Sequence, residues 1–140
     1  MSGMIEELTN FIVRAKAASY VGSGKASASY RPGSHDLEFR DGEFYYLDSY
    51  FGGADFIGEE VVYFKGKPVW AMNYYGRILA PGRITGEETG QMIKTSLSVL
   101  YKENRFLGGF EYTTGRDRYI DTNEGDVASR SPAWKHRQRR

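Results

Sequence analysis

The first apolar residues of the chain recur at intervals of three and four. This spacing is typical of an amphipathic helix, and its members are Ile5, Leu8, Phe11, Ile12 and Ala15. We predict a helix over residues 4–19, which ends before Gly22 and Gly24 because glycine commonly follows the last helical turn. The residues expected to face water are Glu6, Glu7, Arg14 and Lys16.

Residues 35–79 are rich in aromatic and β-branched side chains, which favour strands over helices. Asp41-Gly42 between two such runs predicts a β-hairpin with a two-residue turn. Lys65-Gly66 predicts a second hairpin in the same way, and Gly52-Gly53 joins the two. We therefore expect four strands in a meander.

The remaining pattern predicts one more helix and one more hairpin. Thr85 and Glu88 form a capping-box sequence before an apolar helical face, so a helix is expected over residues 86–103. A turn at Thr114-Gly115 would then set Glu111 opposite Arg118. The fold class is α+β: a single antiparallel sheet, a meander of about six strands, packed against two helices.

Length, charge and cysteine usage restrict the functional classes. A chain of 140 residues suits one domain, expected over residues 1–130, with a basic tail over 131–140. The absence of cysteine excludes disulfides and thiolate chemistry. No apolar run is long enough for a membrane span and no signal peptide is evident, so the simplest localisation is cytoplasmic. No metal site or cofactor is expected.

The charges are unevenly distributed along the chain. The net charge is +1, and the tail carries Lys135, Arg137, Arg139 and Arg140 without an acid, leaving the body mildly acidic. Contact with nucleic acid is therefore expected, if anywhere, only through the tail. The simpler interpretation of the tail is a solvated C-terminus.

His35 draws attention because the predicted hairpin register sets it opposite Asp48. A carboxylate beside an imidazole favours its charged form, an arrangement suited to a general base. A structural histidine uses the same contact to satisfy its ring nitrogens, and this is the more common situation. The catalytic hypothesis therefore competes with a structural one.

Glu59 and Glu60 are the candidate acids. A register with Val61 opposite Trp70 sets Glu59 opposite Met72 and turns one glutamate toward each largely apolar face. A carboxyl group held in apolar surroundings has a raised pKa, as a general acid requires. The alternative is that both glutamates lie in solvent at the start of their strand.

Several polar and aromatic residues form a candidate ligand site at a rim of the sheet. The site would lie between the segments RPGSH and MNYYGR, with arginine meeting an anionic group and aromatic rings stacking on the ligand. The candidate ligand-binding residues are Arg31, Ser34, Tyr46, Tyr50, Trp70, Asn73, Tyr75 and Arg77. A surface ion pair is an equally simple role for Arg31.

Four segments resemble the DUF5680 family, a bacterial domain of unknown function. They are R-P-G-S-H-D at 31–36, Y-x-D-x-Y-x-G-G at 46–53, G-E-E at 58–60 and W-x-M-N-Y-x-G at 70–76. The resemblance implies no established activity. It implies that members occur alone or beside a helix-turn-helix domain, which suits a sensory or ligand-binding role.

Three functions are open on this sequence. The first is a non-catalytic, small-molecule-binding or sensory module for a polar or anionic ligand, with nucleotide-like compounds among the candidates. The second is a small hydrolase or lyase, with His35 and Asp48 as base pair and a glutamate as acid. The third is a protein-interaction domain of the inhibitor or immunity type. The absence of a G-x-S-x-G motif favours binding over catalysis, and a homodimer is a further possibility.

Overall fold

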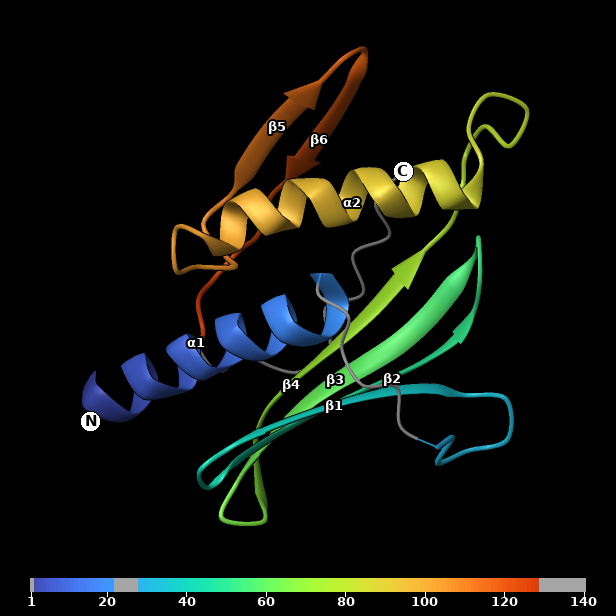
Figure 1. The fold of residues 1–140 in the computed structure, drawn as a ribbon. Helices are drawn as coiled ribbons and strands as arrows, with labels where there is room; N and C mark the ends of the chain where they lie inside the picture. Colours follow the sequence, from blue (N-terminus) through green and yellow to red (C-terminus); the bar gives the residue numbers. More distant parts are fainter. Residues whose placement is uncertain (1, 22–27, 129–140) are drawn as a thin grey trace.

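The computed structural model describes residues 2–21 and 28–128, and their elements follow the predicted order (Figure 1). Helix α1 (Ser2–Lys16) continues into a π-helical turn, η1 (Ala17–Val21), and helix α2 spans Gly86–Tyr101. The strands are β1 (His35–Asp41), β2 (Phe44–Gly52), β3 (Phe56–Phe64), β4 (Lys67–Gly76), β5 (Phe110–Thr114) and β6 (Asp117–Asp121). The predicted α+β class is confirmed.

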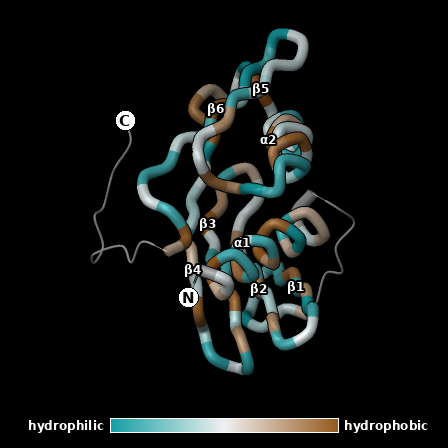
Figure 2. The backbone as a smooth tube through the Cα atoms, turned by 90° about the vertical axis from the view of Figure 1, so that its left-hand side faces the viewer, coloured by the Kyte–Doolittle hydropathy of each residue, from teal (hydrophilic) through white to brown (hydrophobic). Residues whose placement is uncertain are grey.

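The prediction of one six-stranded sheet is wrong. Strands β1 to β4 form an antiparallel sheet in chain order, whereas β5 and β6 pair only with each other. The views agree that α2 lies between this hairpin and the sheet (Figures 1 and 2). Arg105 fixes the turn after α2 by donating to the carbonyls of Leu107 and Gly109, at 2.8 and 2.9 Å. This turn directs the chain away from the sheet edges.

The β1–β2 register differs from the predicted one by two residues. The loop is Gly42-Glu43, and Asp41 lies opposite Phe44. Gly42 has a φ of 59° in the first loop position, the position that type II′ turns reserve for glycine. Because the shift is even, every side chain keeps its predicted face, but its partner across the ladder changes.

The β5–β6 hairpin has the same kind of turn. Gly115, with a φ of 58°, takes the first loop position, so Thr114 lies opposite Asp117. Glu111 therefore lies opposite Ile120 rather than Arg118. The predicted contact nevertheless forms diagonally: the guanidinium of Arg118 lies 2.6 Å from the carboxylate of Glu111.

A register shift in the β3–β4 hairpin changes which residues face the helices. The Lys65-Gly66 turn forms as predicted, with positive φ at both residues, but the pairing slips between Val62 and Tyr63. Tyr63 pairs with Pro68, which has no N–H to donate to the ladder. Trp70 consequently lies opposite Val62, not Val61, and Met72 opposite Glu60, not Glu59.

The hydrophobic core lies between α1, the inner face of the sheet and the end of α2. Phe11 of α1 stacks on Phe44 with ring centroids 4.8 Å apart, and Phe106 meets Trp70 edge to face at 5.7 Å. In Figure 2 apolar segments in brown follow the helices and strands that surround this core. The largest fully buried apolar side chains are Tyr46, Phe11, Ile12, Leu100 and Val62. Neither helix of the described residues lies over the outer face of the sheet (Figure 1).

Candidate functional site

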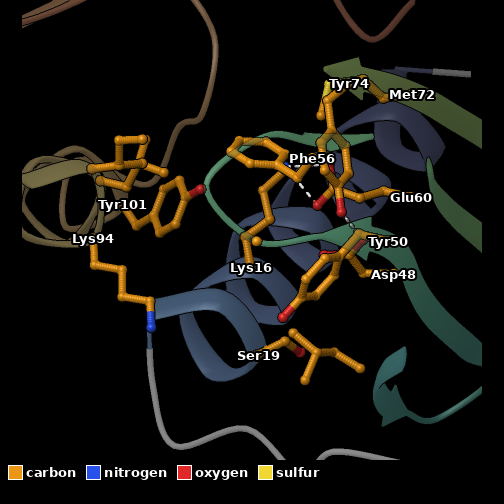
Figure 3. Close-up of a pocket in the computed structure, with 14 residues that line it drawn as sticks. Lys16, Ser19, Asp48, Tyr50, Phe56, Glu60, Met72, Tyr74, Lys94 and Tyr101 are labelled. Atoms are coloured by element: carbon orange, nitrogen blue, oxygen red, sulfur yellow. Dashed lines mark hydrogen bonds and ion pairs between the residues drawn. The ribbon is translucent and has the colours of Figure 1, made fainter. Parts of the chain in front are cut away.

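A cavity of about 510 Å³ lies between the inner face of the sheet, the end of α1 and the side of α2 (Figure 3). We call it the inner cavity. Its polar wall is formed by Lys16, Ser19, Asp48, Glu60, Lys94 and the hydroxyl-bearing rings of Tyr50, Tyr74 and Tyr101. Its remaining wall is formed by Leu37, Gly53, Phe56, Met72, Ile93 and Leu97. Ligand pockets typically combine apolar walls with a few convergent polar groups in this way.

The register of the sheet explains how these groups meet. On the inner face, one cross-strand row contains Leu37, Asp48, Glu60 and Met72. The next row contains Tyr50, Gly58 and Tyr74. A Cβ on Gly58 would lie 2.4 Å from the Cζ and Oη atoms of Tyr74. Glycine therefore lets the Tyr74 ring lie over β3 and reach the carboxylate of Asp48.

Lys16 and Glu60 form a buried ion pair in the wall of the inner cavity. The Nζ of Lys16 donates to both carboxylate oxygens of Glu60, at 2.8 and 2.7 Å. The hydroxyl of Tyr46 donates to the same carboxylate. The ammonium group also lies 5.4 Å from the ring centroid of Phe106 and 6.0 Å from that of Trp70. These contacts offset the cost of burying two charges.

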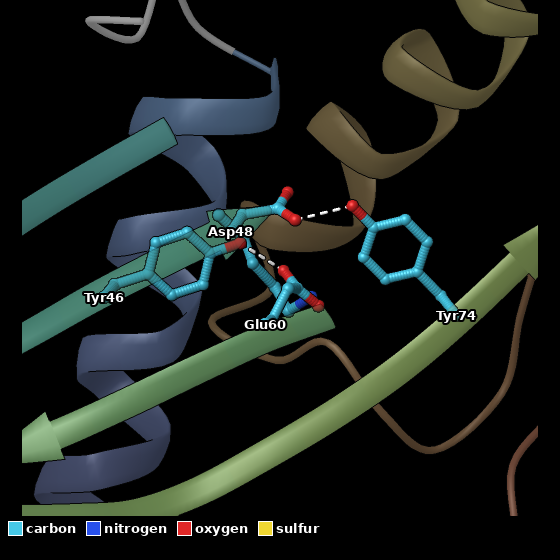
Figure 4. Close-up of polar contacts among 5 residues, drawn as sticks. Tyr46, Asp48, Glu60 and Tyr74 are labelled. Atoms are coloured by element: carbon cyan, nitrogen blue, oxygen red, sulfur yellow. Dashed lines mark hydrogen bonds and ion pairs between the residues drawn. The ribbon is translucent and has the colours of Figure 1, made fainter. Parts of the chain in front are cut away.

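Asp48 lies beside this pair but has a different environment. Its carboxylate accepts a hydrogen bond of 2.5 Å from the hydroxyl of Tyr74 and is only 3% exposed (Figure 4). Burial raises the pKa of Asp48 to about 6, and the negative charge of Glu60 adds to the effect. The hydrogen bond from Tyr74 and the charge of Lys16 act against this rise. Asp48 can therefore change its charge near neutral pH.

The tyrosines around the two carboxylates are hydrogen-bond donors. Burial raises the pKa of Tyr46 and of Tyr74, and the neighbouring carboxylates raise both further. Both phenols therefore stay protonated throughout the pH range in which the protein is expected to be folded. Their hydrogen bonds fix the positions of the Glu60 and Asp48 carboxylates, and the phenols themselves remain uncharged.

Ser19 contributes a buried polar atom to the inner cavity. Its Oγ makes no hydrogen bond to any residue that the structure describes. Ser19 lies in the π-helical turn η1, and such turns occur frequently at functional sites. A buried hydroxyl without a partner has a free-energy cost that a bound ligand can remove.

His35 and Asp48 do not pair, which corrects the predicted register. His35 lies opposite Tyr50 and stacks on its ring at a centroid distance of 4.9 Å, while Asp48 lies opposite Leu37. His35 is exposed and does not line the inner cavity. The predicted base pair is therefore absent, because the turn type displaced the register by two residues.

Glu59 and Glu60 point to opposite faces of the sheet, as the alternation of side chains along a strand requires. Glu60 points into the inner face and is 4% exposed, so the interpretation that both glutamates lie in solvent is wrong. Glu59 points to the outer face, where it is exposed. The structure thus brings together Asp48 and Glu60 of the four predicted acid–base residues, together with Tyr50.

Arg31 and Ser34 belong to a turn that caps the start of β1. The Ser34 hydroxyl donates to a carboxylate oxygen of Asp36 at 2.6 Å and lies 2.9 Å from the Arg31 carbonyl oxygen. Burial alone would raise the pKa of Asp36, but hydrogen bonds from Ser34, Ser49 and the Tyr30 amide lower it. Ser34 is buried in this network, so its contacts are structural.

The outer face of the sheet carries a groove of about 430 Å³. Arg31, Glu59 and Asn73 contribute polar groups to it, over a floor that includes Leu47, Phe51 and Tyr63. The other predicted ligand residues lie elsewhere: Tyr46 and Trp70 in or against the core, Tyr75 and Arg77 exposed at the end of β4. The predicted ligand set is therefore divided between two faces.

Sequence reasoning missed Lys16, Ser19 and Lys94, and it left Tyr74 out of the candidate residues although Tyr74 lies in the MNYYGR segment. Lys16 was predicted to face water, yet it is 6% exposed, because its ammonium group lies against Glu60 and the rings of Trp70 and Phe106. One signal was available: Lys16 follows Ile12 by four residues and so continues the apolar stripe. A glutamate directed into an apolar face requires a cation of that kind.

Two further properties concern the described part of the chain. No group of three or more His, Cys, Asp or Glu side chains there is arranged to hold a metal ion. None of its helices has the length and apolar character needed to cross a membrane.

The fold and the site define an α+β domain with a cavity between its helices and its four-stranded sheet, lined by both polar and apolar side chains. The sequence model of the family described as "Domain of unknown function (DUF5680)" matches residues 48–132, which is more than half of the chain. The chain belongs to this family. The match includes Asp48, Glu60, Tyr74 and α2, whereas the R-P-G-S-H-D segment precedes it. No curated protein and no solved structure matches the chain.

Proposed function

We propose that this domain is a non-catalytic module that binds a small polar ligand in the inner cavity. The observation that carries the proposal is a cavity of about 510 Å³ whose wall contains buried polar groups, among them a serine hydroxyl without a partner. Unsatisfied buried groups are uncommon in folded proteins. A ligand that fills the cavity and hydrogen-bonds to Ser19 and Asp48 would account for both the cavity and the buried polar groups in its wall.

Binding is favoured over catalysis by the state of the acidic groups. The carboxylate of Glu60 is held by hydrogen bonds from Lys16 and Tyr46. His35, the expected base, lies outside the cavity. These contacts support a rigid recognition site rather than an acid–base pair.

One observation supports a second candidate function, that of a hydrolase or lyase. Asp48 lines the cavity, and its pKa of about 6 suits a general acid or base. In that case Asp48→Asn would abolish turnover while leaving ligand affinity within a few fold. In a purely binding protein no turnover of a bound compound would be detectable, with or without Asp48.

A thermal-shift screen of the full chain tests the proposal. The compounds would include amines, carboxylates, nucleotides and sugar phosphates, each at several concentrations. A ligand at 100 times its dissociation constant stabilises the fold by about 2.7 kcal/mol, an easily measured shift in Tm. A response from none of these classes would overturn the proposal and favour a protein partner.

A pair of variants locates the response within the molecule. Ile93→Trp places a large side chain on the cavity wall of α2 and should remove the ligand-induced shift in Tm. Ile120→Trp makes the same change on β6, where the side chain is 57% exposed, and should leave the shift intact. Equal responses from both variants would place the ligand outside the inner cavity.

A further inference from the structure

Resting on the proposed function, we infer that the ligand of the inner cavity is an organic amine, whose ammonium group meets the carboxylate of Asp48 and whose apolar body lies among the aromatic rings on the sheet. The inference depends on which charges of the cavity are already paired. It departs from the expectation of an anionic ligand, which depended on Arg31 and Arg77. Neither arginine lines the inner cavity.

Asp48 is a buried carboxylate without a cation of its own. Lys16, the nearest buried cation, donates to both oxygens of Glu60. Asp48 receives the Tyr74 hydroxyl, and no ion pair reaches it from the residues that the structure describes. A buried carboxylate without a cation is costly, so an ammonium group gains more here than at a surface.

The rings around Asp48 suit the same ligand. Tyr50 follows Asp48 by two residues on the same face of β2, and Phe56 lies 6.0 Å from Tyr74 between ring centroids. All three rings line the cavity (Figure 3). Aromatic faces attract cations and also pack against apolar carbon, so they can hold both parts of an arylalkyl or alkyl amine.

Among the described residues of the cavity wall, Lys94 carries the one positive charge that is not in an ion pair, and this charge opposes a cation. Its side chain extends from α2 and is exposed, so water and salt screen its charge. Asp48 is 3% exposed and interacts at a lower effective dielectric. The buried carboxylate therefore dominates the field felt by a group bound next to it.

The ionisation of Asp48 gives the inference a pH signature. The titratable groups that line the cavity with Asp48 or contact its neighbours are Lys16 of α1, Tyr46 and Tyr50 of β2, Glu60 of β3, Tyr74 of β4, and Lys94 and Tyr101 of α2. Asp36 of β1 points to the other face of the sheet and acts on Asp48 only through its charge. With a pKa of about 6, Asp48 is roughly nine-tenths ionised at pH 7 and one-tenth at pH 5. An amine that needs the carboxylate should bind about tenfold more weakly at pH 5.

Two probes of opposite charge test the inference on the full chain. 2-Phenylethylamine and phenylacetate share an aromatic ring and differ in the sign of their charge. NMR titrations at pH 7 should give a Kd for the amine at least about tenfold below that for the acid. Asp48→Asn should remove this preference, whereas Glu59→Gln, an exposed change on the outer face, should preserve it.

The possible failures can be told apart. A preference for phenylacetate, or an amine Kd that does not change with pH, would overturn the amine inference and leave the binding function intact. No response to any compound class in the thermal-shift screen would overturn the binding function itself. If Asp48→Asn does not fold, the pKa of Asp48 in the wild type is measured instead, from the NMR shift of its carboxyl carbon. Saturating amine must lower this pKa, and an unchanged pKa contradicts the inference.

Discussion

The Nζ of Lys16 lies 2.7 and 2.8 Å from the two carboxylate oxygens of Glu60, and both side chains are buried. The pair joins the last turn of α1 to the middle of β3, 44 residues further along the chain. Among the described charged residues of the cavity wall, this pairing leaves Asp48 and the exposed Lys94 outside an ion pair. The selectivity that we infer for the cavity therefore depends on this contact.

Replacing Lys16 by Met should leave Glu60 as an uncompensated buried charge. Breaking a buried pair by removal of one partner costs about 3–5 kcal/mol, because the desolvation of the other charge is no longer offset. Urea denaturation at pH 7 should therefore show a loss of that size in the free energy of unfolding. The double variant Lys16→Met with Glu60→Gln should be more stable than the single one, since the charge is gone and Tyr46 can still donate to the amide oxygen.

A matched surface pair provides the control for Lys16→Met. Lys65 lies 3.7 Å from Glu43, and both side chains are more than half exposed. Lys65→Met should change the free energy of unfolding by less than about 1 kcal/mol, because exposed ion pairs contribute little. Equal losses in the two lysine variants would contradict the assignment of Lys16 as the buried partner of Glu60.

Tyr74→Phe should destabilise the ionised form of Asp48. The phenol donates the 2.5 Å hydrogen bond to the carboxylate and lowers its pKa, so its removal should raise the pKa of Asp48 above about 6. Hydrogen bonds to charged groups contribute about 1.5–3 kcal/mol, and the loss of stability should be of that order at pH 7. It should be smaller at acidic pH, where Asp48 is neutral. NMR titration and urea denaturation measure the two effects, and an unchanged pKa would contradict the contact.

The periodicity of the sequence predicted the elements and the faces of the first hairpin, but not every partner. Gly42 occupies the first position of its turn, so the register moved by two residues and the alternation of faces survived. In the second hairpin the pairing shifts by one residue next to Pro68. Trp70 and Met72 therefore lie on the same face as Glu60 instead of that of Glu59. A bulge of this kind is not encoded in the turn residues from which the register was derived.

The cavity itself could not be predicted from local patterns. Lys16, Asp48, Tyr74 and Lys94 come from four different elements, and only tertiary packing brings them together. The hairpin arithmetic correctly gave Asp48 and Glu60 as polar residues on strands with apolar neighbours. It could not identify Lys16 as the cation that Glu60 requires, because the two are joined by the packing of α1 on the sheet.

Stability should depend on pH through Asp48 with a definite sign. Its pKa in the folded state, about 6, is above its ordinary value of 3.8, so the folded protein binds the proton more tightly than the unfolded chain. The resulting stabilisation is fully present below pH 3.8 and is lost as the pH rises through 6, a change of about 3 kcal/mol. Asp48→Asn removes this titration. The free energy of unfolding of the wild type, minus that of the variant, should therefore fall between pH 4 and 7. Urea denaturation at several pH values in this range measures the difference. A difference that stays constant or rises with pH would contradict the assignment.

Two glycine-to-alanine changes should have opposite effects. At Gly58 the added Cβ would lie 2.4 Å from the Tyr74 ring and 2.8 Å from the Ser49 carbonyl oxygen, so Tyr74 must leave Asp48 or the strands must separate. Overpacking of this kind costs about 1–3 kcal/mol. At Gly90, inside α2, the added Cβ meets no atom within 4 Å, and alanine should stabilise the helix by up to about 1 kcal/mol. Urea denaturation gives both changes, and the amide spectrum around Tyr74 reports whether its ring has moved. A Gly58→Ala protein as stable as wild type, with Tyr74 still bonded to Asp48, would contradict the account of how the sheet admits that ring.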